Sequence, residues 1–283
     1  MTAPTVVAVV VNYNAGDHLA ECVQSLRADG VDEVVVVDNA SVDGSIDRLR
    51  TRHPSTTVIA AGRNLGFGAA ANLGAAGRDA TYILVLNPDI VVEPGTVKSL
   101  VGVLEADPSV AIAGPRIEEP DGTLYPSARS FPSLGDAAGH AFLGLVWKNN
   151  PFTRRYRMQD WGHGSARLVD WVSGACFLAR RTHFEELGGF DPGYFMYVED
   201  VDLCWRAGRR GWGVAYEPAG RVTHVQGVST ARAPYRMIAA HHRSTLRFYR
   251  RTARGLARLA TPAVAVALGV RLVIACGAQV FRR

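Results

Sequence analysis

Apolar and polar positions alternate along the first 115 residues in a way that predicts a parallel β-sheet with connecting helices. Short β-branched runs are separated by segments with apolar residues at helical spacing, which is typical of repeated βαβ units. Right-handed crossovers would then place the carboxyl ends of these strands at one edge of the sheet. The expected strands are 6–11, 33–38, 57–61, 82–86 and 110–114, and the expected helices are 17–29, 43–52, 66–77 and 94–106.

One of these strands, from Tyr82 to Leu86, ends abruptly in Asn87, Pro88 and Asp89. A five-residue apolar run is typical of a strand buried on both faces, and proline cannot continue a central ladder. We therefore expect Asp89 just past the carboxyl end, where open α/β sheets bind their ligands. A carboxylate there can hold a divalent cation, which can in turn hold a diphosphate. The alternative is an ordinary Asn-Pro turn without a ligand.

Polar side chains also follow the other strands at this predicted edge. Asp38 ends its strand before Asn39 and Ser41, and its carboxylate can accept a hydrogen bond from a pyrimidine ring N–H. Asn12 and Asn14 offer further polar contacts beside it. Alternatively, Asp38 and Ser41 form an Asx-type turn that caps the next helix. The residue types alone leave both interpretations open.

A second polar turn, with Arg63, Asn64 and Gly66, leads into an alanine-rich helix. Its glycine spacing does not match a Rossmann fingerprint, and no Walker lysine motif occurs in the chain. The sequence therefore argues against those two modes of nucleotide binding.

Three carboxylates within four residues, Glu199, Asp200 and Asp202, form the best candidate for a catalytic base. Helix capping explains any one of them equally well, and a helix N-terminus lowers a carboxyl pKa. The neighbouring aromatic residues would partly desolvate the cluster, which raises the pKa toward a useful value. His224 is a weaker candidate, because an isolated histidine becomes a metal ligand only if the fold returns it to Asp89.

Composition and charge restrict the class of protein further. The 283 residues are 48% hydrophobic, and the four cysteines are far apart, which favours a folded protein in a reducing cytosol. The first residues, Met-Thr-Ala-Pro, lack the basic region of a signal peptide, so we expect none. The net charge of +5 is unevenly distributed: twelve arginines follow the last acidic residue, Glu217, so residues 1–217 carry −7. An acidic body with a basic, apolar tail favours an anionic membrane surface over nucleic acid as the partner.

Periodicity fades between residues 115 and 166, and a loop of that length is usually functional or mobile. The pattern predicts one strand over 168–181, interrupted by the small residues Gly174 and Ala175, where a ligand or backbone can approach closely.

Residues 235–260 predict a basic amphipathic helix, with Leu246, Tyr249, Ala253, Leu256 and Ala260 on one stripe and Arg243, Arg247, Arg250, Arg254 and Arg258 beside it.

This tail suits either a lipid interface or packing against the rest of the protein. Residues 262–281 are long enough to span a bilayer, but Arg271 lies at their middle, which favours an element that lies on the membrane or pairs with another helix.

Taken together, these motifs resemble family 2 glycosyltransferases of the GT-A fold, especially their rhamnosyltransferase-like branch. The resemblance rests on segments 9–14, 36–45, 64–68, 86–89, 174–176, 188–191, 199–203 and His224, all in the family's order. It implies an α/β catalytic domain over 1–230, with a nucleotide-sugar half (1–115) and an acceptor half (116–230). Helices of a membrane-associating tail follow over 231–283.

The resemblance also implies residue roles. Asp38 looks like the reader of the pyrimidine base. Asn87-Pro88-Asp89 looks like the family's Asp-x-Asp element with its first acid replaced. Asp200 matches the catalytic base, and His224 matches a histidine near the metal and diphosphate. The expected sets are catalytic, Asp200 and Glu199; nucleotide-sugar-binding, Asn12, Asn14, Asp38, Asn39, Arg63, Asn64, Gly66, Asn87 and Asp89; metal, Asp89 and His224; acceptor, Gly174, Ala175 and Asp202.

The implied reaction is an inverting, Mg²⁺- or Mn²⁺-dependent sugar transfer, with dTDP-rhamnose the favoured donor and a cell-envelope glycan or polyprenyl-diphosphate-linked sugar the acceptor. The enzyme would act at the cytoplasmic face of the membrane, and its oligomeric state is not encoded in these motifs. A UDP- or GDP-sugar donor is one alternative. A nucleotidyltransferase would need a glycine-rich, basic N-terminal signature where Asn12 and Asn14 stand, and a non-catalytic binding protein would not need Asp89 and Asp200.

Overall fold

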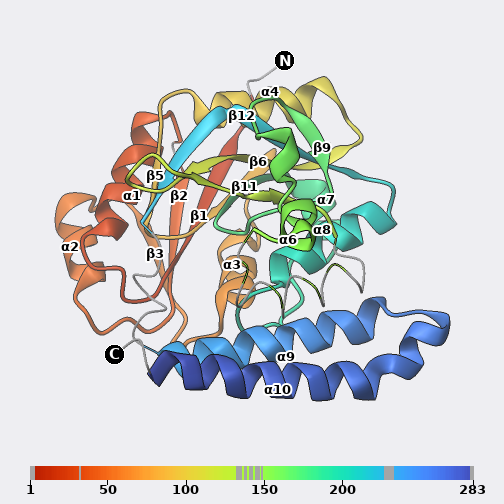
Figure 1. Ribbon diagram of the computed structural model, residues 1–283. Coiled ribbons are helices and arrows are strands. Elements are labelled where there is room, and N and C mark those ends of the chain that lie inside the picture. Colours follow the sequence, from red (N-terminus) through yellow and green to blue (C-terminus); the bar gives the residue numbers. More distant parts are fainter. Residues whose placement is uncertain are drawn as a thin grey trace.

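The computed structural model describes residues 4–31, 33–131, 136, 139, 143, 147, 149–225 and 233–280. In this part of the chain a twisted central sheet is covered by helices, and two long C-terminal helices lie along one end (Figure 1). The strands are β1 (Val6–Asn12), β2 (Glu33–Asp38), β3 (Thr57–Ala60), β4 (Tyr82–Leu86), β5 (Ile90–Val92), β6 (Val110–Glu118), β7 (Leu124–Tyr125), β8 (Ala128–Arg129), β9 (Arg167–Val169), β10 (Trp171–Val172), β11 (Cys176–Arg180) and β12 (Gly213–His224). The helices are α1 (His18–Ala28), α2 (Ser45–Arg52), α3 (Phe67–Ala75), α4 (Thr96–Ala106), α6 (Pro151–Tyr156), α7 (Arg181–Glu186), α8 (Glu199–Arg209), α9 (Pro234–Thr252) and α10 (Thr261–Val280), with short 3₁₀ turns η1 (Gln159–Trp161) and η2 (Gly255–Ala260).

The main sheet has the strand order β3-β2-β1-β4-β11-β6-β12-β5. Strands β1, β2, β3 and β4 pair in parallel, and β12 is parallel to β6. Strand β11 runs antiparallel between β4 and β6, so its first residue, Cys176, pairs with the last residue of β4, Leu86. The edge strand β5 is likewise antiparallel to β12. The predicted mostly parallel sheet is confirmed, and the turns after β1, β2 and β4 meet at one edge.

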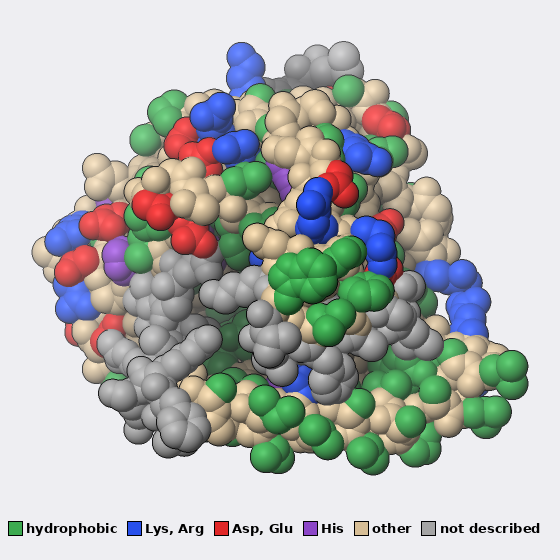
Figure 2. Space-filling view, in the orientation of Figure 1, with side chains coloured by type: hydrophobic (Ala, Val, Ile, Leu, Met, Phe, Trp, Pro, Cys, Tyr) green, Lys and Arg blue, Asp and Glu red, His purple; other side chains and the backbone are tan. Residues whose placement is uncertain are grey.

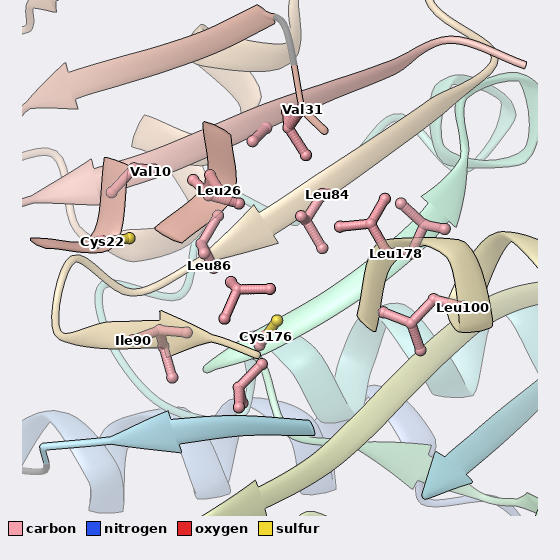
Figure 3. Close-up of a cluster of buried hydrophobic side chains, with 14 of the residues drawn as sticks. Val10, Cys22, Leu26, Val31, Leu84, Leu86, Ile90, Leu100, Cys176 and Leu178 are labelled. Carbon is pink, nitrogen blue, oxygen red and sulfur yellow. The ribbon is translucent and has the colours of Figure 1, made fainter. Parts of the chain in front are cut away.

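Strand β4 shows why the apolar runs form this core. All five of its residues are buried, and they alternate between two apolar clusters on opposite faces of the sheet. Leu84 packs with Leu26 of α1 and Leu100 of α4 (Figure 3), whereas Val85 belongs to the cluster that contains Phe190. Complete burial of each such side chain stabilises the fold by roughly 1.5–3 kcal/mol relative to exposure.

The structure corrects the predicted strand over 168–181. The chain forms three strands there instead, β9, β10 and β11, with breaks at Asp170 and at residues 173–175. Strand β10 leaves the main sheet and pairs with β8, and the following turn at Gly174 leads into β11. The alternation of apolar residues identifies extended backbone but does not reveal which partner each piece selects. The expectation that 115–166 forms a functional or mobile loop stays a prediction, because much of 132–148 lies outside the described residues.

The predicted basic helix over 235–260 is also longer than the observed one. Helix α9 ends at Thr252, and Ala253 has an extended backbone that leads into η2. Tyr249 and Ala253 of the predicted stripe are buried, but Leu256 is 84% exposed. Helix α10 then runs back beside α9 (Figure 1), and a guanidinium nitrogen of Arg271 lies 3.2 Å from Nε2 of His242. The apolar C-terminal stretch is therefore paired with a helix, as Arg271 indicated.

Candidate active site

The turn after β1 is fastened to the turn after β2 by the side chain of Asn12. Its buried amide nitrogen lies 3.0 Å from Oδ1 of Asp38 and 3.0 Å from the hydroxyls of Ser41 and Ser45. The backbone N–H of Ser41 donates to both oxygens of Asp38 at 3.3 Å, so the Asx-type turn does form. It does not cap the next helix, because the N-cap of α2 is Gly44. This network fixes the Asp38 carboxylate at the sheet edge, and its contact with a base stays a prediction.

Two further asparagines hold the neighbouring turns together. Asn14 has a left-handed backbone (φ 53°), which asparagine tolerates well, and its Oδ1 accepts a hydrogen bond from the N–H of Val42 at 2.8 Å. The side chain of Asn39 accepts from the N–H of Leu65 at 3.2 Å and donates to the carbonyl of Gly66 at 3.3 Å. The predicted nucleotide-side turns therefore converge, although Asn12 and Asn14 are buried supports of the cleft wall.

The turn that contains Arg63, Asn64 and Gly66 contributes mainly through its backbone. Oδ1 of Asn64 accepts from the N–H of Gly66 at 2.9 Å. Gly66 has φ +86°, and a Cβ there would lie 2.1 Å from the carbonyl oxygen of Phe195, so only glycine fits. Asn64 lines the cleft, whereas Arg63 is exposed and is not among the lining residues.

The chain does return His224 to Asp89. Strand β5 follows Asp89 directly and pairs antiparallel with the end of β12, where His224 is opposite Ile90. Nε2 of His224 consequently lies 3.2 Å from Oδ1 of Asp89, and the amide nitrogen of Asn87 lies 3.3 Å from the same Nε2. Both Asp89 and His224 are buried in the cleft wall.

These residues fit a divalent cation that arrives with its ligand. Oδ1 of Asp89 is buried and, apart from its 3.2 Å approach to Nε2 of His224, has no hydrogen-bond partner among the described residues, so a cation can bind between these two atoms. Within the described residues, no group of three or more His, Cys, Asp and Glu side chains surrounds one point. Asp89 and His224 would therefore supply two ligands and leave the other positions to diphosphate oxygens and water.

Asp200 lies at the start of α8 and is held by backbone donors. Its Oδ2 accepts from the N–H of Gly174 at 2.8 Å, and its Oδ1 accepts from the N–H of Val201 at 2.8 Å. A Cβ at Gly174 would approach the Asp200 side chain to 3.1 Å, which explains a small residue there. The predicted pair Gly174 and Ala175 thus lies beside the predicted base, and Asn87 donates its N–H to the carbonyl of Ala175 at 2.9 Å.

Glu199 and Asp200 are adjacent carboxyl groups in a desolvated site. Burial raises the pKa of Glu199 to about 8, and the negative charge of Asp200 adds to the rise. Burial also raises the pKa of Asp200, but the N–H groups of Gly174 and Val201 and the charge of Arg129 oppose it. Asp200 is therefore the member of the pair that holds the negative charge, and Glu199 is the member that retains the proton.

The residues just before α8 have strained backbones. Tyr197 and Val198 have φ values of 67° and 69°, which are costly for non-glycine residues and most of all for a β-branched one. The N–H of Phe67 donates to the carbonyl of Phe195 at 3.1 Å, and the hydroxyl of Ser244 in α9 donates to the carbonyl of Met196 at 2.9 Å. Contacts from α3 and α9 therefore hold the strained segment in place.

Asp202, predicted at the acceptor, is placed elsewhere. It is fully buried, and its oxygens accept hydrogen bonds from Arg206 at 2.7 Å and from the hydroxyl of Tyr194 at 3.3 Å. The Nε of Arg251 in α9 lies 3.2 Å from the same carboxylate. Because α8 turns by about 100° per residue, Asp200 and Asp202 point in different directions. Asp202 is not among the residues that line the cleft.

The cleft itself has a volume of about 470 Å³ and joins the sheet edge to the C-terminal helices. Asn39, Asn87, Asp89, Glu199, Asp200 and His224 all line it. Sequence reasoning missed a second group of lining residues, Tyr125, Arg129, Tyr156, Trp171, Arg236 and His241. For Tyr125, Arg129 and Tyr156, the richness of 115–166 in aromatic residues and arginine was the available signal, but no motif ordered it.

The comparisons with known proteins agree with this geometry. The model of "Glycosyl transferase family 2" matches residues 7–188. The chain belongs to this family. It is 41% identical over 253 residues to the N-acetylglucosaminyl-diphospho-decaprenol L-rhamnosyltransferase of Mycobacterium tuberculosis, covering 85% of this chain and 82% of that protein. It is 28% identical over 225 residues to rhamnosyltransferase WbbL of Escherichia coli, covering 76% and 81%. The chain is therefore a glycosyltransferase, and the predicted branch is confirmed.

Solved structures with the same fold confirm the predicted GT-A architecture of this family 2 member. The mannosyltransferase PcManGT of Pyrobaculum calidifontis, in complex with GDP-Man and Mn²⁺, has a TM-score of 0.61 at 18% identity and covers 98% of this chain and 76% of its own. GalNAc-T7 with UDP, GalNAc and Mn²⁺ has a TM-score of 0.60 at 19% identity, covering 78% of this chain and 43% of its own. At these identities the likeness concerns the fold.

Proposed function

We propose that this family 2 glycosyltransferase moves L-rhamnose from dTDP-rhamnose to a sugar carried on a polyprenyl diphosphate. The observation that carries the proposal is a single cleft that combines Asp89 and His224 with Asp200. Asp89 and His224 can bind a nucleoside diphosphate through a metal ion, and the Asp200 carboxylate can accept a proton from an acceptor hydroxyl. The rhamnosyl and lipid-linked parts rest on the rhamnosyltransferase relative, of which this chain covers 82%.

The reaction is a single displacement with inversion at the anomeric carbon. The acceptor oxygen attacks that carbon, the bond to the nucleoside diphosphate breaks, and Asp200 accepts the hydroxyl proton. The N–H groups of Gly174 and Val201 hold the Asp200 carboxylate in a fixed orientation. Mg²⁺ or Mn²⁺ bound by Asp89 and His224 would stabilise the departing diphosphate. Asp38, Asn39, Asn64 and Asn87 are proposed contacts of the nucleoside and its sugar.

The proposed site of action is the inner face of the cell membrane, reached through α10. Residues 255–279 form one helical stretch that is long and apolar enough to cross a membrane by length and composition. Leu259 is 76% exposed and Val273 is 72% exposed, and an apolar band runs along these helices in Figure 2. Because Arg271 is directed at His242 of α9, we favour a helix pair that lies on the bilayer surface over a spanning helix.

Release of nucleoside diphosphate, measured over a panel of UDP-, GDP- and dTDP-sugars, tests this proposal. We expect rapid release only with dTDP-rhamnose together with N-acetylglucosaminyl-diphospho-lipid, and a product with inverted anomeric configuration by NMR. The Asp200→Asn variant is the matched control for contaminating hydrolases. A faster reaction with another nucleotide sugar would identify that sugar, and not dTDP-rhamnose, as the donor. Release of nucleoside diphosphate that does not depend on an acceptor would contradict sugar transfer.

A further inference from the structure

Arg129 of β8 is enclosed by three aromatic rings in the cleft. Its guanidinium carbon lies 5.4 Å from the ring centre of Tyr125, 5.5 Å from that of Tyr156 and 5.0 Å from that of Trp171. Its Nε donates to the carbonyl of Pro126 at 2.7 Å, and its Nη2 donates to the hydroxyl of Tyr125 at 3.0 Å. These contacts fix the orientation of the guanidinium without neutralising its charge. Among the described residues, no carboxylate forms a salt bridge with it.

The strand pair that carries Arg129 also positions the catalytic base. Arg129 is opposite Trp171 in the antiparallel pair of β8 and β10. The chain then continues from β10 into Gly174, whose N–H donates to Asp200 at 2.8 Å. Arg129 and Asp200 also line the same cleft. A ligand held by Arg129 would therefore lie beside the group that takes the acceptor proton.

Arg129 lies away from the proposed contacts of the donor nucleoside. A Cβ at Gly114 of β6 would lie 2.7 Å from the side chain of Val172, so β10 packs on β6. In the sheet, β4 and β11 separate β6 from β1 and β2, whose turns carry the proposed nucleoside contacts. The aromatic enclosure is consequently on the side of the sheet edge away from the nucleoside.

A second arginine reaches the cleft from the C-terminal helices. Arg236, in the first turn of α9, lines it together with Met237 and His241. Arg129 and Arg236 are the only arginine or lysine side chains among the residues that line the cleft in the described part of the chain. Because α9 also packs against the apolar helix α10, Arg236 lies on the element that connects the cleft with the proposed membrane face.

We propose that Arg129 and Arg236 bind the diphosphate of the lipid-linked acceptor. This inference rests on the proposed function, since only an acceptor of that class brings a second diphosphate into the cleft. Guanidinium groups bind phosphate oxygens through paired, charge-assisted hydrogen bonds, and the aromatic enclosure strengthens these bonds by limiting water. Donor and acceptor diphosphates would thus be recognised separately, the first at Asp89 and His224 and the second at the two arginines.

Two acceptors that differ only in the diphosphate test the inference. One is N-acetylglucosaminyl-diphospho-lipid with a short lipid chain, and the other is a neutral alkyl N-acetylglucosaminide. We expect Arg129→Met and Arg236→Gln to raise the KM for the diphosphate acceptor roughly 10- to 100-fold, with the KM for the neutral acceptor and for the donor unchanged. Arg167→Met is the matched control, because Arg167 also stacks on a ring, that of Trp161 at 5.6 Å, but is exposed and does not line the cleft.

Other outcomes would overturn the inference. An unchanged KM for the diphosphate acceptor in both variants would contradict it, and a raised donor KM would assign the arginines to the donor. A fall of kcat with both acceptors is expected of Arg129→Met, because the charge of Arg129 also lowers the pKa of Asp200. If Arg129→Met does not fold, as judged by circular dichroism, the exposed Arg236→Gln variant decides, and an unchanged acceptor KM then contradicts the inference. Absence of transfer by the wild-type enzyme to either acceptor would instead contradict the proposed function.

Discussion

Arg247 of α9 binds Asp191, a residue of the turn that leads toward helix α8, which carries the proposed base Asp200. Its Nη2 lies 3.0 and 2.9 Å from the two oxygens of Asp191, and Nη1 of Arg251 donates to the same carboxylate at 2.7 Å. The sequence pattern grouped Arg247 with arginines that could face lipid. In the fold, α9 is instead attached to the catalytic part of the chain, and its first turn lines the cleft.

This attachment predicts a stability effect of Arg251. Replacement of Arg251 by Gln should lower the free energy of unfolding by roughly 1–3 kcal/mol, because Asp191 and the fully buried Asp202 both lose a charged donor. Arg250→Gln is the matched control on the same helix, and a change within about 0.5 kcal/mol is expected for this exposed residue. Urea unfolding measures both variants, and equal effects would show that the ion pairs contribute nothing specific.

Two truncations should separate membrane attachment from activity. Removal of residues 254–283 deletes α10 and its exposed apolar face, so the protein should move to the soluble fraction and still transfer sugar to a water-soluble acceptor. Removal of 234–283 also deletes Arg236, His241 and Ser244, and activity should fall strongly with both acceptors. Fractionation and the release assay give the two readouts. An unchanged membrane fraction after the shorter truncation would refute the proposed role of α10.

Asp200→Asn should reduce turnover by roughly 10²- to 10⁴-fold, because an amide cannot accept the acceptor proton. Asparagine keeps only one of the two oxygens that accept from the N–H groups of Gly174 and Val201. Donor binding should nevertheless be preserved, because the proposed nucleotide contacts lie elsewhere. Turnover and calorimetric binding of dTDP measure the two effects. Substantial residual turnover would transfer the role of base to Glu199.

The raised pKa of Glu199 predicts a pH-dependent stability. Burial and the charge of Asp200 raise this pKa from the usual 4.5 to about 8. A carboxyl group whose pKa is raised in the folded state makes a contribution to the free energy of unfolding that depends on pH. This contribution is fully present below pH 4.5 and is lost as the pH rises through 8. Glu199→Gln is neutral at every pH, so its melting temperature should exceed that of wild type by a margin that grows between pH 5 and pH 8.5. A constant margin in thermal scans would contradict the assignment.

Metal removal provides a test of Asp89 and His224. EDTA should abolish transfer, and Mn²⁺ or Mg²⁺ should restore it. His224→Ala should require a higher metal concentration for half-maximal activity, by roughly tenfold, because one of two protein ligands is lost. Asp89→Asn should have a larger effect, since it removes the charged ligand. Full activity of the metal-free wild-type enzyme would exclude this role for both residues.

The sequence by itself determined the local elements and the sheet edge where the candidate site lies. Strand and helix periodicities depend on neighbouring residues, so β1 to β4 and the ejection of Asp89 from β4 could be predicted. The order of the family motifs added Asp200. Parallel strands pointing the same way then made the turns at Asn12, Asp38 and Asp89 converge.

Only the tertiary structure decided which distant side chains meet. Asp202 is within the predicted acidic cluster, but its partner Arg251 is on another helix, and that contact turns it away from the cleft. Arg129 lies in a segment without periodicity, and its proposed role depends on the pairing of β8 with β10. Charged side chains obtain their function from their partners, and a partner remote in sequence is specified by the path of the whole chain rather than by any local pattern.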